Sequence, residues 1–235
     1  MHLSENEGIE GKTFVVTGGL GFVGAALCLE LVRRGAVEVR SLDPRPASPW
    51  SIQLRKSRVE CIQGPPFLLL SLSLSLSLPL RPLPSTARNC FYGWLIVLCF
   101  YYDELLLSHL YSNIIHLNFA GDISRKKDVE KALRGADCVF HLASYGMSGK
   151  EMLQAGRTDE VNINGTCNIL DVCHQFGIKR LVYVSTYNVV FGGKEIVNGN
   201  ESLPYFPIDE HVDPYGRSKS IAEQLVLKSN GRPSK

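Results

Sequence analysis

Residues 13–24 read Thr-Phe-Val-Val-Thr-Gly-Gly-Leu-Gly-Phe-Val-Gly, and this stretch decides the fold. Its first five residues form a short apolar and β-branched run, which is typical of a buried strand. Gly18, Gly21 and Gly24 follow, and residues 25–34 then show a helical pattern. A glycine turn between a strand and a helix lets backbone N–H groups approach a pyrophosphate at the positive end of the helix. The stretch therefore predicts the start of a dinucleotide-binding fold.

Further strands and helices alternate along the chain. Short apolar runs predict strands at residues 37–42, 59–62, 137–142 and 180–185, and a helical pattern runs through residues 161–176. Alternation of this kind indicates an α/β fold. We therefore expect a Rossmann-type, doubly wound parallel sheet that extends over residues 11–235.

Asp43 ends the second predicted strand and lies 19 residues after Gly24. A carboxylate at this place can accept hydrogen bonds from both hydroxyls of an adenosine ribose, which a 2′-phosphate would prevent. Asp43 therefore favours NAD as the cofactor. Arg45 stands two residues later, and an Arg nearby can hold a 2′-phosphate, so NADP stays open.

Tyr215 and Lys219 form a Tyr-x-x-x-Lys pair inside a helical pattern that begins after Pro214. Residues four apart share one face of a helix. An ammonium group close to a phenol favours the phenolate, so we expect the pKa of Tyr215 to be lowered. A tyrosine tuned in this way can take or give a proton at a carbon that bears a hydroxyl. The pair alone is common on exposed helices. It indicates a catalytic site only because the same chain also carries the glycine turn.

Composition excludes several other classes of protein. The chain has 235 residues, of which 45% are hydrophobic, enough for a core rather than a disordered tail. A net charge of +2 gives no overall electrostatic attraction to nucleic acid. The seven Cys include no C-x-x-C pair, so we expect free thiols and no metal site. The polar, acidic N-terminus resembles no secretory signal or presequence, and we expect a cytoplasmic protein.

Residues 64–120 break the strand–helix pattern. A Leu-Ser repeat at 68–78 is of low complexity, and it is what an in-frame CT repeat, ordinary in introns, would encode. The apolar run 91–102 is shorter than the about 20 residues that span a bilayer, so it favours membrane association over spanning. We interpret 64–120 as an atypical insertion in the domain, poorly ordered and lowering solubility. It would also displace Asp122.

The motifs of the chain, taken together, resemble those of a known enzyme family. They are residues 17–24, Asp43, His141-Leu142-Ala143, Asn162-x-x-Gly165-Thr166, Ser185-Thr186 and Tyr215-x-x-x-Lys219. This set resembles the extended short-chain dehydrogenase/reductases. The runs 141–151 and 185–193 are similar to the 3β-hydroxysteroid dehydrogenase/isomerase-like branch, and most of all to its plant sterol dehydrogenase-like members, some of which carry a reticulon-type membrane region. The resemblance covers residues 11–63 and 121–235.

The resemblance implies roles for individual residues. Tyr215 would be the catalytic acid/base, and Lys219 would bind the nicotinamide ribose. Thr186, with Ser185 next, would hold the substrate oxygen, although counting back from Gly192 puts that position on Tyr187. The implied cofactor-binding residues are Gly18, Gly21, Phe22, Val23, Gly24, Asp43, Asp122, Ala143, Tyr215 and Lys219, with Asp122 meeting the adenine.

The implied reaction is hydride transfer between an alcohol carbon and a nicotinamide cofactor. The substrate would be a small sterol or steroid-like alcohol, as in steroid biosynthesis, and the enzyme would be cytoplasmic or at the cytosolic face of the endoplasmic reticulum membrane. The sequence does not decide the oligomeric state. A nucleotide-sugar epimerase or dehydratase of the same fold is the alternative within the superfamily.

Two features depart from the family. In relatives the third strand runs directly into Gly-Asp, and removing the 57 residues 64–120 would join Gln63 to Gly121 in that way. The chain also stops at Lys235, soon after the Tyr-x-x-x-Lys helix. We therefore expect the C-terminal substrate region to be absent. A truncated splice product that is inactive, and at most binds a dinucleotide, is a third hypothesis.

Overall fold

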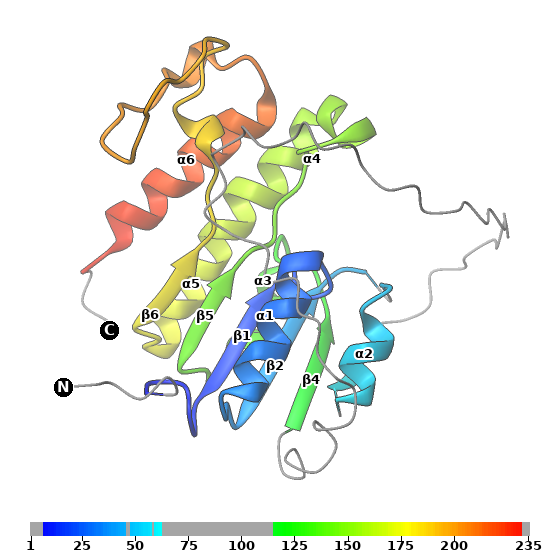
Figure 1. Ribbon diagram of the computed structural model, residues 1–235. Helices are drawn as coiled ribbons and strands as arrows, with labels where there is room; N and C mark the ends of the chain where they lie inside the picture. Colours follow the sequence, from blue (N-terminus) through cyan, green and yellow to red (C-terminus); the bar gives the residue numbers. More distant parts are fainter. Residues whose placement is uncertain (1–6, 46–47, 58, 63–114, 232–235) are drawn as a thin grey trace, which may run out of the picture. The chain divides into compact units, whose positions relative to one another are not determined.

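One parallel sheet organises the protein. The structure, a computed structural model, describes residues 7–45, 48–57, 59–62 and 115–231. Its six strands lie in the order β3-β4-β2-β1-β5-β6 (Figure 1). Their bounds are β1 Thr13–Thr17, β2 Glu38–Asp43, β3 Val59–Ile62, β4 Ile115–Ala120, β5 Cys138–His141 and β6 Arg180–Tyr183. The order reverses at β1, which is the topology of a doubly wound fold and confirms the predicted class.

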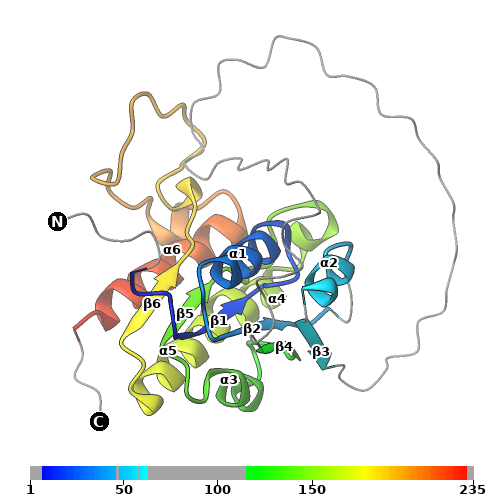
Figure 2. The same cartoon turned by 60° about the horizontal axis from the view of Figure 1, so that its bottom comes forward.

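Helices cover both faces of this sheet. Their bounds are α1 Phe22–Arg33, α2 Ser51–Lys56, α3 Lys126–Leu133, α4 Ala155–Asp159, α5 Gly165–Phe176 and α6 Pro214–Ser229. Short turns of other helix types are η1 Gly149–Leu153, η2 Glu160–Asn164, η3 Tyr187–Val189 and η4 Ile208–Glu210. Figure 2 shows α1 on one face of the sheet and α3 and α5 on the other. Within the described residues, none of the helices is long and apolar enough to cross a membrane.

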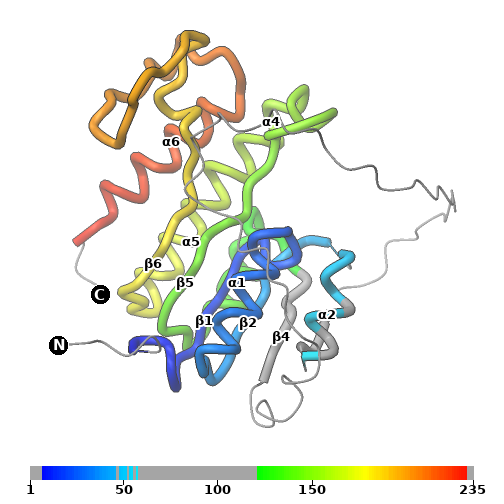
Figure 3. Tube along the Cα trace, viewed as in Figure 1, coloured from blue at the N-terminus to red at the C-terminus, as the bar shows by residue number. Residues whose placement is uncertain are grey.

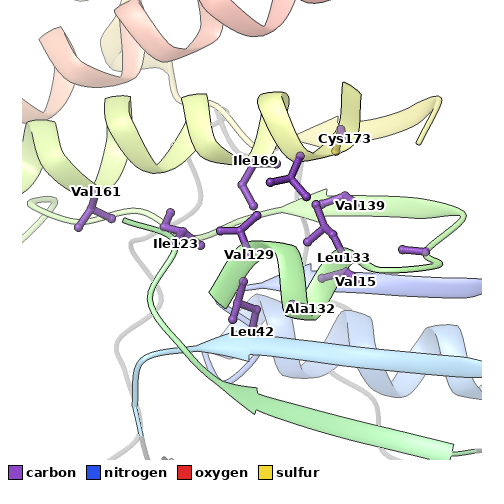
Figure 4. Packing of buried hydrophobic residues seen from close by; sticks show 12 residues of the cluster. Val15, Leu42, Ile123, Val129, Ala132, Leu133, Val139, Val161, Ile169 and Cys173 are labelled. Carbon is purple, nitrogen blue, oxygen red and sulfur yellow. The ribbon is translucent and has the colours of Figure 1, made fainter. Parts of the chain in front are cut away.

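The main core fills the space between the sheet and the pair α3 and α5 (Figure 4). Val15 of β1 and Val139 of β5 are fully buried against side chains of the helices, among them Leu133 and Ile169. Burying a side chain of this size stabilises the fold by about 1.5–3 kcal/mol. These contacts fix the helices on the sheet, and so they fix the loops at its edge.

Parallel strands carry their carboxyl ends to one edge, and this edge gathers residues that are far apart in the sequence. β1 pairs with both β2 and β5, so the loops after Thr17, Asp43 and His141 are neighbours (Figure 3). β5 pairs in turn with β6, which brings in the loop after Tyr183. Ligands of open α/β sheets bind at this edge, where the strand order reverses.

The structure corrects the expected boundary of the insertion. Ile115–Ala120, expected to lie outside the strand–helix pattern, forms β4 between β2 and β3. The reason lies in its alternation of apolar Ile, Leu and Phe with other residues, a period of two that is typical of a strand. Each residue of β3 pairs with the residue 57 positions later in β4, from Val59 with His116 to Ile62 with Phe119. The expectations for residues 64–114, including poor order, lie outside the described residues.

Candidate active site

The glycine turn has the close packing that a phosphate cradle needs. Gly18 has a φ of 70°, in the left-handed region, and a Cβ there would lie 3.1 Å from the backbone of Ala143. A Cβ on Gly24 would lie 2.3 Å from the carbonyl oxygen of Gly18. Gly21 begins α1 as an N-cap without a side chain. Any larger residue would push the helix away from the turn, so the N-terminus of α1 stays open to an anion. The predicted Phe22 and Val23 form its exposed first turn.

Asp43 is 2% exposed at the end of β2, and its carboxylate already has partners. Its Oδ2 accepts from the backbone N–H of Leu20 at 3.1 Å and from Arg45 Nη2 at 2.6 Å. Its Oδ1 accepts from the backbone N and the Nε of Arg45, at 3.0 and 2.8 Å. The hydrogen bond to Asp43 raises the pKa of Arg45. A ribose diol would therefore have to displace the guanidinium group from Asp43.

The Arg45 guanidinium also lies close to the glycine turn, because a Cβ on Gly21 would be 3.5 Å from its Nη2. Its side chain is half exposed, so it can leave Asp43 at small cost to packing. The residues present fit both NAD and NADP. Asp43 suits a ribose with free hydroxyls, as in NAD, and Arg45 suits the 2′-phosphate of NADP.

Asp122 follows β4 and points toward α4. Its Oδ2 accepts from Arg157 Nη2 at 2.5 Å, and its Oδ1 accepts from the backbone N–H of Ser124 at 2.9 Å. Burial raises the pKa of Asp122, but the hydrogen bonds from Ser124 and Arg157 outweigh burial, and the net shift is downward. The carboxylate is thus ionised at the sheet edge, at the end of the strand that pairs with β2.

Tyr215 and Lys219 lie on one face of α6, as their spacing predicts, and they are 7% and 2% exposed. The helix begins at Pro214 because Asp213 caps it, accepting a hydrogen bond from the backbone N–H of Gly216 at 2.7 Å. Lys219 Nζ donates to the carbonyl oxygen of Val184 at 2.7 Å. Burial lowers the pKa of Lys219 to about 7, against an opposing effect of Glu223. Lys219 is therefore poised to titrate near neutral pH.

The expectation that Lys219 lowers the pKa of Tyr215 is wrong. Burial raises the pKa of Tyr215, a hydrogen bond with Ser144 lowers it, and the charge of Asp213 raises it; the net shift is upward. The ammonium of Lys219 instead lies 4.1 Å from the centre of the Tyr183 ring. The physical reason is that the side chains on this face of α6 are packed away from water, which penalises the phenolate.

The two hydroxyls expected to hold a substrate oxygen have other partners. Thr186 caps η3, and its Oγ1 accepts from the backbone N–H of Asn188 at 3.3 Å. Ser185 Oγ donates to Glu223 on α6. Both residues therefore lie just after β6, but the hydrogen bonds of their side chains go to Asn188 and Glu223 and not to Tyr215. Tyr187, the other position counted from the sequence, is exposed.

A buried polar chain begins at Thr17, directly before the glycine turn. Thr17 Oγ1 lies 2.7 Å from Nδ1 of His141, and Nε2 of His141 lies 3.0 Å from Oγ1 of Thr166. Thr166 donates its own proton to the carbonyl oxygen of Asn162, so Nε2 carries the ring proton and Nδ1 accepts from Thr17. Burial lowers the pKa of His141 to about 3, with a smaller effect of the Lys219 charge. The imidazole is neutral and serves as a structural link.

The buried polar chain continues from Asn162 to α6. Asn162 Nδ2 donates to Ser218 Oγ at 2.9 Å, and Ser218 Oγ donates to the carbonyl oxygen of Tyr215 at 2.8 Å. Asn162 also exchanges two hydrogen bonds with the backbone of Tyr145, at 2.8 and 2.9 Å. The glycine turn, the loop after β5 and α6 are therefore held in one network.

Sequence reasoning missed three residues of this site. Ser144 lowers the pKa of Tyr215 against the effect of burial, Glu223 accepts a hydrogen bond from Ser185, and Ser218 joins α6 to Asn162. The spacing of Glu223, four residues after Lys219 on the same helical face, was a usable signal. Ser144 gave no signal, because only the fold brings the loop after β5 to α6.

Comparison with known proteins agrees with this geometry. The model of the 3-beta hydroxysteroid dehydrogenase/isomerase family matches residues 15–65 and 102–235. Over 115 residues the chain is 58% identical to human "Short-chain dehydrogenase/reductase family 42E member 1", which covers 48% of this chain and 29% of that protein. It is 42% identical over 115 residues to isoform 1 of the Arabidopsis thaliana 3beta-hydroxysteroid-dehydrogenase/decarboxylase, covering 48% of this chain and 25% of that protein. The matched stretch thus spans less than a third of these relatives.

Solved structures show the same fold. The epimerase Mth375 of Methanothermobacter thermautotrophicus is similar with a TM-score of 0.61 at 21% identity, covering 95% of this chain and 49% of that chain. A short-chain dehydrogenase/reductase superfamily protein of Agrobacterium tumefaciens, solved with bound NAD, has a TM-score of 0.56 at 20% identity and covers 91% of this chain and 44% of that chain. Since the family model matches most of its residues, this chain belongs to the 3-beta hydroxysteroid dehydrogenase/isomerase family.

Proposed function

We propose that this protein is an NAD-dependent oxidoreductase that acts on the CH–OH group of a sterol or steroid-like alcohol. One set of contacts carries the proposal. Ala143 lies against Gly18 of the glycine turn, and the N–H of the nearby Tyr145 donates to Asn162. Asn162 donates in turn to Ser218, which donates to the carbonyl oxygen of Tyr215. One loop therefore joins the cradle for a dinucleotide to the helix that carries a proton-transferring phenol.

The cofactor proposed is a nicotinamide dinucleotide, with NAD preferred over NADP. The buried carboxylate of Asp43 supports NAD, and the half-exposed guanidinium of Arg45 could pair with a 2′-phosphate. The NAD bound to the fold neighbour from Agrobacterium tumefaciens is in agreement with this choice. The glycines 18, 21 and 24, together with Phe22, Val23 and Ala143, would line the pyrophosphate and ribose.

The chemistry divides between cofactor and protein. When bound, the oxidised nicotinamide supplies the acceptor for the hydride that leaves the alcohol carbon. In its phenolate form, Tyr215 takes the proton of the alcohol hydroxyl as the C–O single bond becomes a carbonyl, and in the reverse direction the resulting phenol returns that proton. Lys219 lies one helical turn further along α6, where its ammonium can hold the nicotinamide ribose. The hydrogen-bond network from Thr17 to Ser218 holds the glycine turn and α6 in fixed positions relative to each other.

A steroid-like substrate is supported by the relatives and by the surface near the site. The Arabidopsis relative carries 3beta-hydroxysteroid-dehydrogenase in its name. Met147, Met152 and Leu153, in the segment after β5, expose apolar side chains that suit a sterol better than a sugar. The alternative, a nucleotide-sugar epimerase, is favoured by the fold neighbours, which include UDP-glucose 4-epimerases of about one-fifth identity.

Turnover distinguishes these functions. The protein is incubated with NAD⁺ or NADP⁺ and a set of 3β-hydroxysterols, and reduced cofactor is followed by its absorbance, with Tyr215→Phe as the control. UDP-glucose and UDP-galactose are tested in parallel. Sterol-dependent reduction that Tyr215→Phe abolishes supports the proposal. Interconversion of the UDP-sugars without sterol turnover supports the alternative, and dinucleotide binding without either reaction contradicts both.

A further inference from the structure

Tyr183, the last residue of β6, presents its ring to the ammonium group of Lys219. Lys219 Nζ lies 4.1 Å from the centre of this ring, inside the about 6 Å over which an aromatic face attracts a cation. The Nζ also donates to the carbonyl oxygen of Val184, the residue after Tyr183, at 2.7 Å. Lys219 is 2% exposed, so little water competes for its charge. The end of β6 therefore holds the ammonium through two adjacent residues.

The ring of Tyr183 is held in place by β5. Tyr183 pairs with His141 in the sheet, and the centres of the two rings are 5.4 Å apart. His141 is itself buried and bonded at both ring nitrogens, to Thr17 and Thr166. The ring that meets Lys219 thus has a fixed position relative to the glycine turn, which begins directly after Thr17.

The hydroxyl of Tyr183 does not explain this arrangement. Its oxygen is buried, and it has no hydrogen-bond partner among the described residues. A buried hydroxyl without a partner lowers stability. Burial raises the pKa of Tyr183, so the phenol is neutral and puts no second charge beside Lys219. The ring of Tyr183, and not its hydroxyl, is therefore the part that stabilises the ammonium.

We propose that Tyr183 is a positioning residue for Lys219, whose ammonium group it stabilises through the face of its ring and holds beside Val184. This inference rests on the proposed function, in which that ammonium holds the nicotinamide ribose. Burial alone favours the neutral amine. The ring opposes the effect of burial, because the negative potential of its face attracts the ammonium more than the amine.

The NMR signal of Lys219 tests the contact without any turnover. The chain is labelled with ¹³Cε-lysine, and Lys219→Met identifies the Lys219 signal. Its ε-protons should resonate upfield of those of the other lysines, because an aromatic ring shifts protons above its face in that direction. Tyr183→Leu should abolish this upfield shift and lower the pKa of Lys219. Tyr183→Phe keeps the ring and loses only the unpartnered hydroxyl, so it should retain both properties and be at least as stable as the parent.

Phe140→Leu is the matched control, because it removes an aromatic ring from the other face of the sheet. Phe140 precedes His141 in β5, and successive residues of a strand point to opposite faces. Its ring packs against Phe14 of β1, with the ring centres 6.0 Å apart. The titration of Lys219 should be the same in Phe140→Leu as in the parent.

The pH dependence of NAD binding supplies the second readout. The other titratable groups around Lys219 are Glu223 and Tyr215 on its own helix and His141 on β5, and none of them is altered. By calorimetry, Tyr183→Leu should bind NAD about tenfold more weakly than the parent at pH 7.5, but within about twofold at pH 5.5, where Lys219 is charged in both. A merely structural role would weaken binding equally at both pH values. Tyr183→Phe should restore the affinity at pH 7.5.

The two readouts separate this inference from the proposed function. An unchanged Lys219 titration in Tyr183→Leu, or an equal change in Phe140→Leu, overturns the inference. So does an ε-proton signal without an upfield shift in the parent, a measurement that needs no folded variant of Tyr183. If the titration moves as expected but NAD affinity does not follow it, the contact between Tyr183 and Lys219 is supported, and the role of Lys219 in the proposed function is contradicted.

Discussion

Asp43, the last residue of β2, should decide whether the protein prefers NAD or NADP. Asp43→Ala should weaken NAD binding by roughly 1–3 kcal/mol, the range for losing a buried charged hydrogen-bond partner. Isothermal titration calorimetry measures the change. Arg45→Ala is the matched variant, since it frees Asp43 and should strengthen NAD binding while weakening NADP binding. Equal NAD affinity in Asp43→Ala and the parent would contradict the assignment.

Tyr215 carries the proton in the proposed reaction. Tyr215→Phe keeps the ring but removes the hydroxyl, so turnover should fall by at least about 10²-fold, the low end for general acid–base catalysis. NAD affinity should be nearly unchanged, which fluorescence titration with NADH can check. Near-parental turnover in this variant would remove Tyr215 from the mechanism.

Lys219 should give the protein a pH-dependent stability. Its pKa is about 7 in the folded protein and 10.5 when unperturbed, so the unfolded chain binds more protons between these values. The stability from neutral Lys219 is full above pH 10.5 and is lost as the pH falls toward 7, by up to about 1.4 kcal/mol per pH unit. Urea unfolding at pH 7.5 and 9.5 should show a smaller gain in Lys219→Met than in the parent. Identical gains would show that Lys219 is protonated in the folded state.

Sequence patterns identified the residues of the site whose spacing carries the signal. The glycine turn, Asp43 and the Tyr215–Lys219 face all lie at the predicted places on their elements. What the sequence could not give is the set of partners. The link between Asp43 and Arg45, and that between Asn162 and Ser218, depend on side-chain directions and on contacts between elements far apart in the sequence.

At the scale of single elements, α5 and α4 show how glycine controls packing. A Cβ on Gly165, the first residue of α5, would lie 2.7 Å from the side chain of Ile123. Gly165→Ala should therefore destabilise the protein by about 1–3 kcal/mol, the usual cost of overpacking. Gly156 in α4 has no atom within 4 Å of such a Cβ, so Gly156→Ala should be neutral or stabilising by up to about 1 kcal/mol. Thermal unfolding of both variants checks the contrast, and equal losses would contradict it.

The predicted elements were accurate where apolar periodicity was strong and incomplete where it was weak. The strands at β1, β2, β5 and β6 and the helices α1 and α5 agree with their patterns to within a few residues. The short helices α2, α3 and α4 were not predicted, because five to eight residues offer too little periodicity. β4 was missed because it follows a long low-complexity run that concealed its alternation.

At the scale of the whole molecule, two deletions separate the roles of β3 and β4. Removing residues 64–120 takes away β4 and joins β3 to Gly121, so β3 can pair with β2 in the vacated place. Removing residues 64–114 keeps both strands but leaves almost no connection between parallel neighbours, which need a dozen or more residues. We expect the first variant to be more soluble than the parent and to bind NADH, and the second to aggregate.

Size-exclusion chromatography and NADH fluorescence measure both properties. A well-folded 64–114 deletion would show that β3 is dispensable in the sheet. A 64–120 deletion less soluble than the parent would show instead that β4 is required beside β2.

The constant offset of 57 residues between β3 and β4 makes the two strands alternative occupants of one position. Residues 64–120 are as long as this offset, so a chain with them and a chain without them carry the same Gly121-Asp122 turn at the same distance after the strand that precedes it. In the longer chain the second strand takes the inner position and the first moves out to the edge. A gene could therefore gain or lose this segment in a single event without passing through a form that lacks a strand beside β2. On the interpretation of residues 64–120 as an insertion, β4 takes the place beside β2 that β3 would fill in the shorter chain.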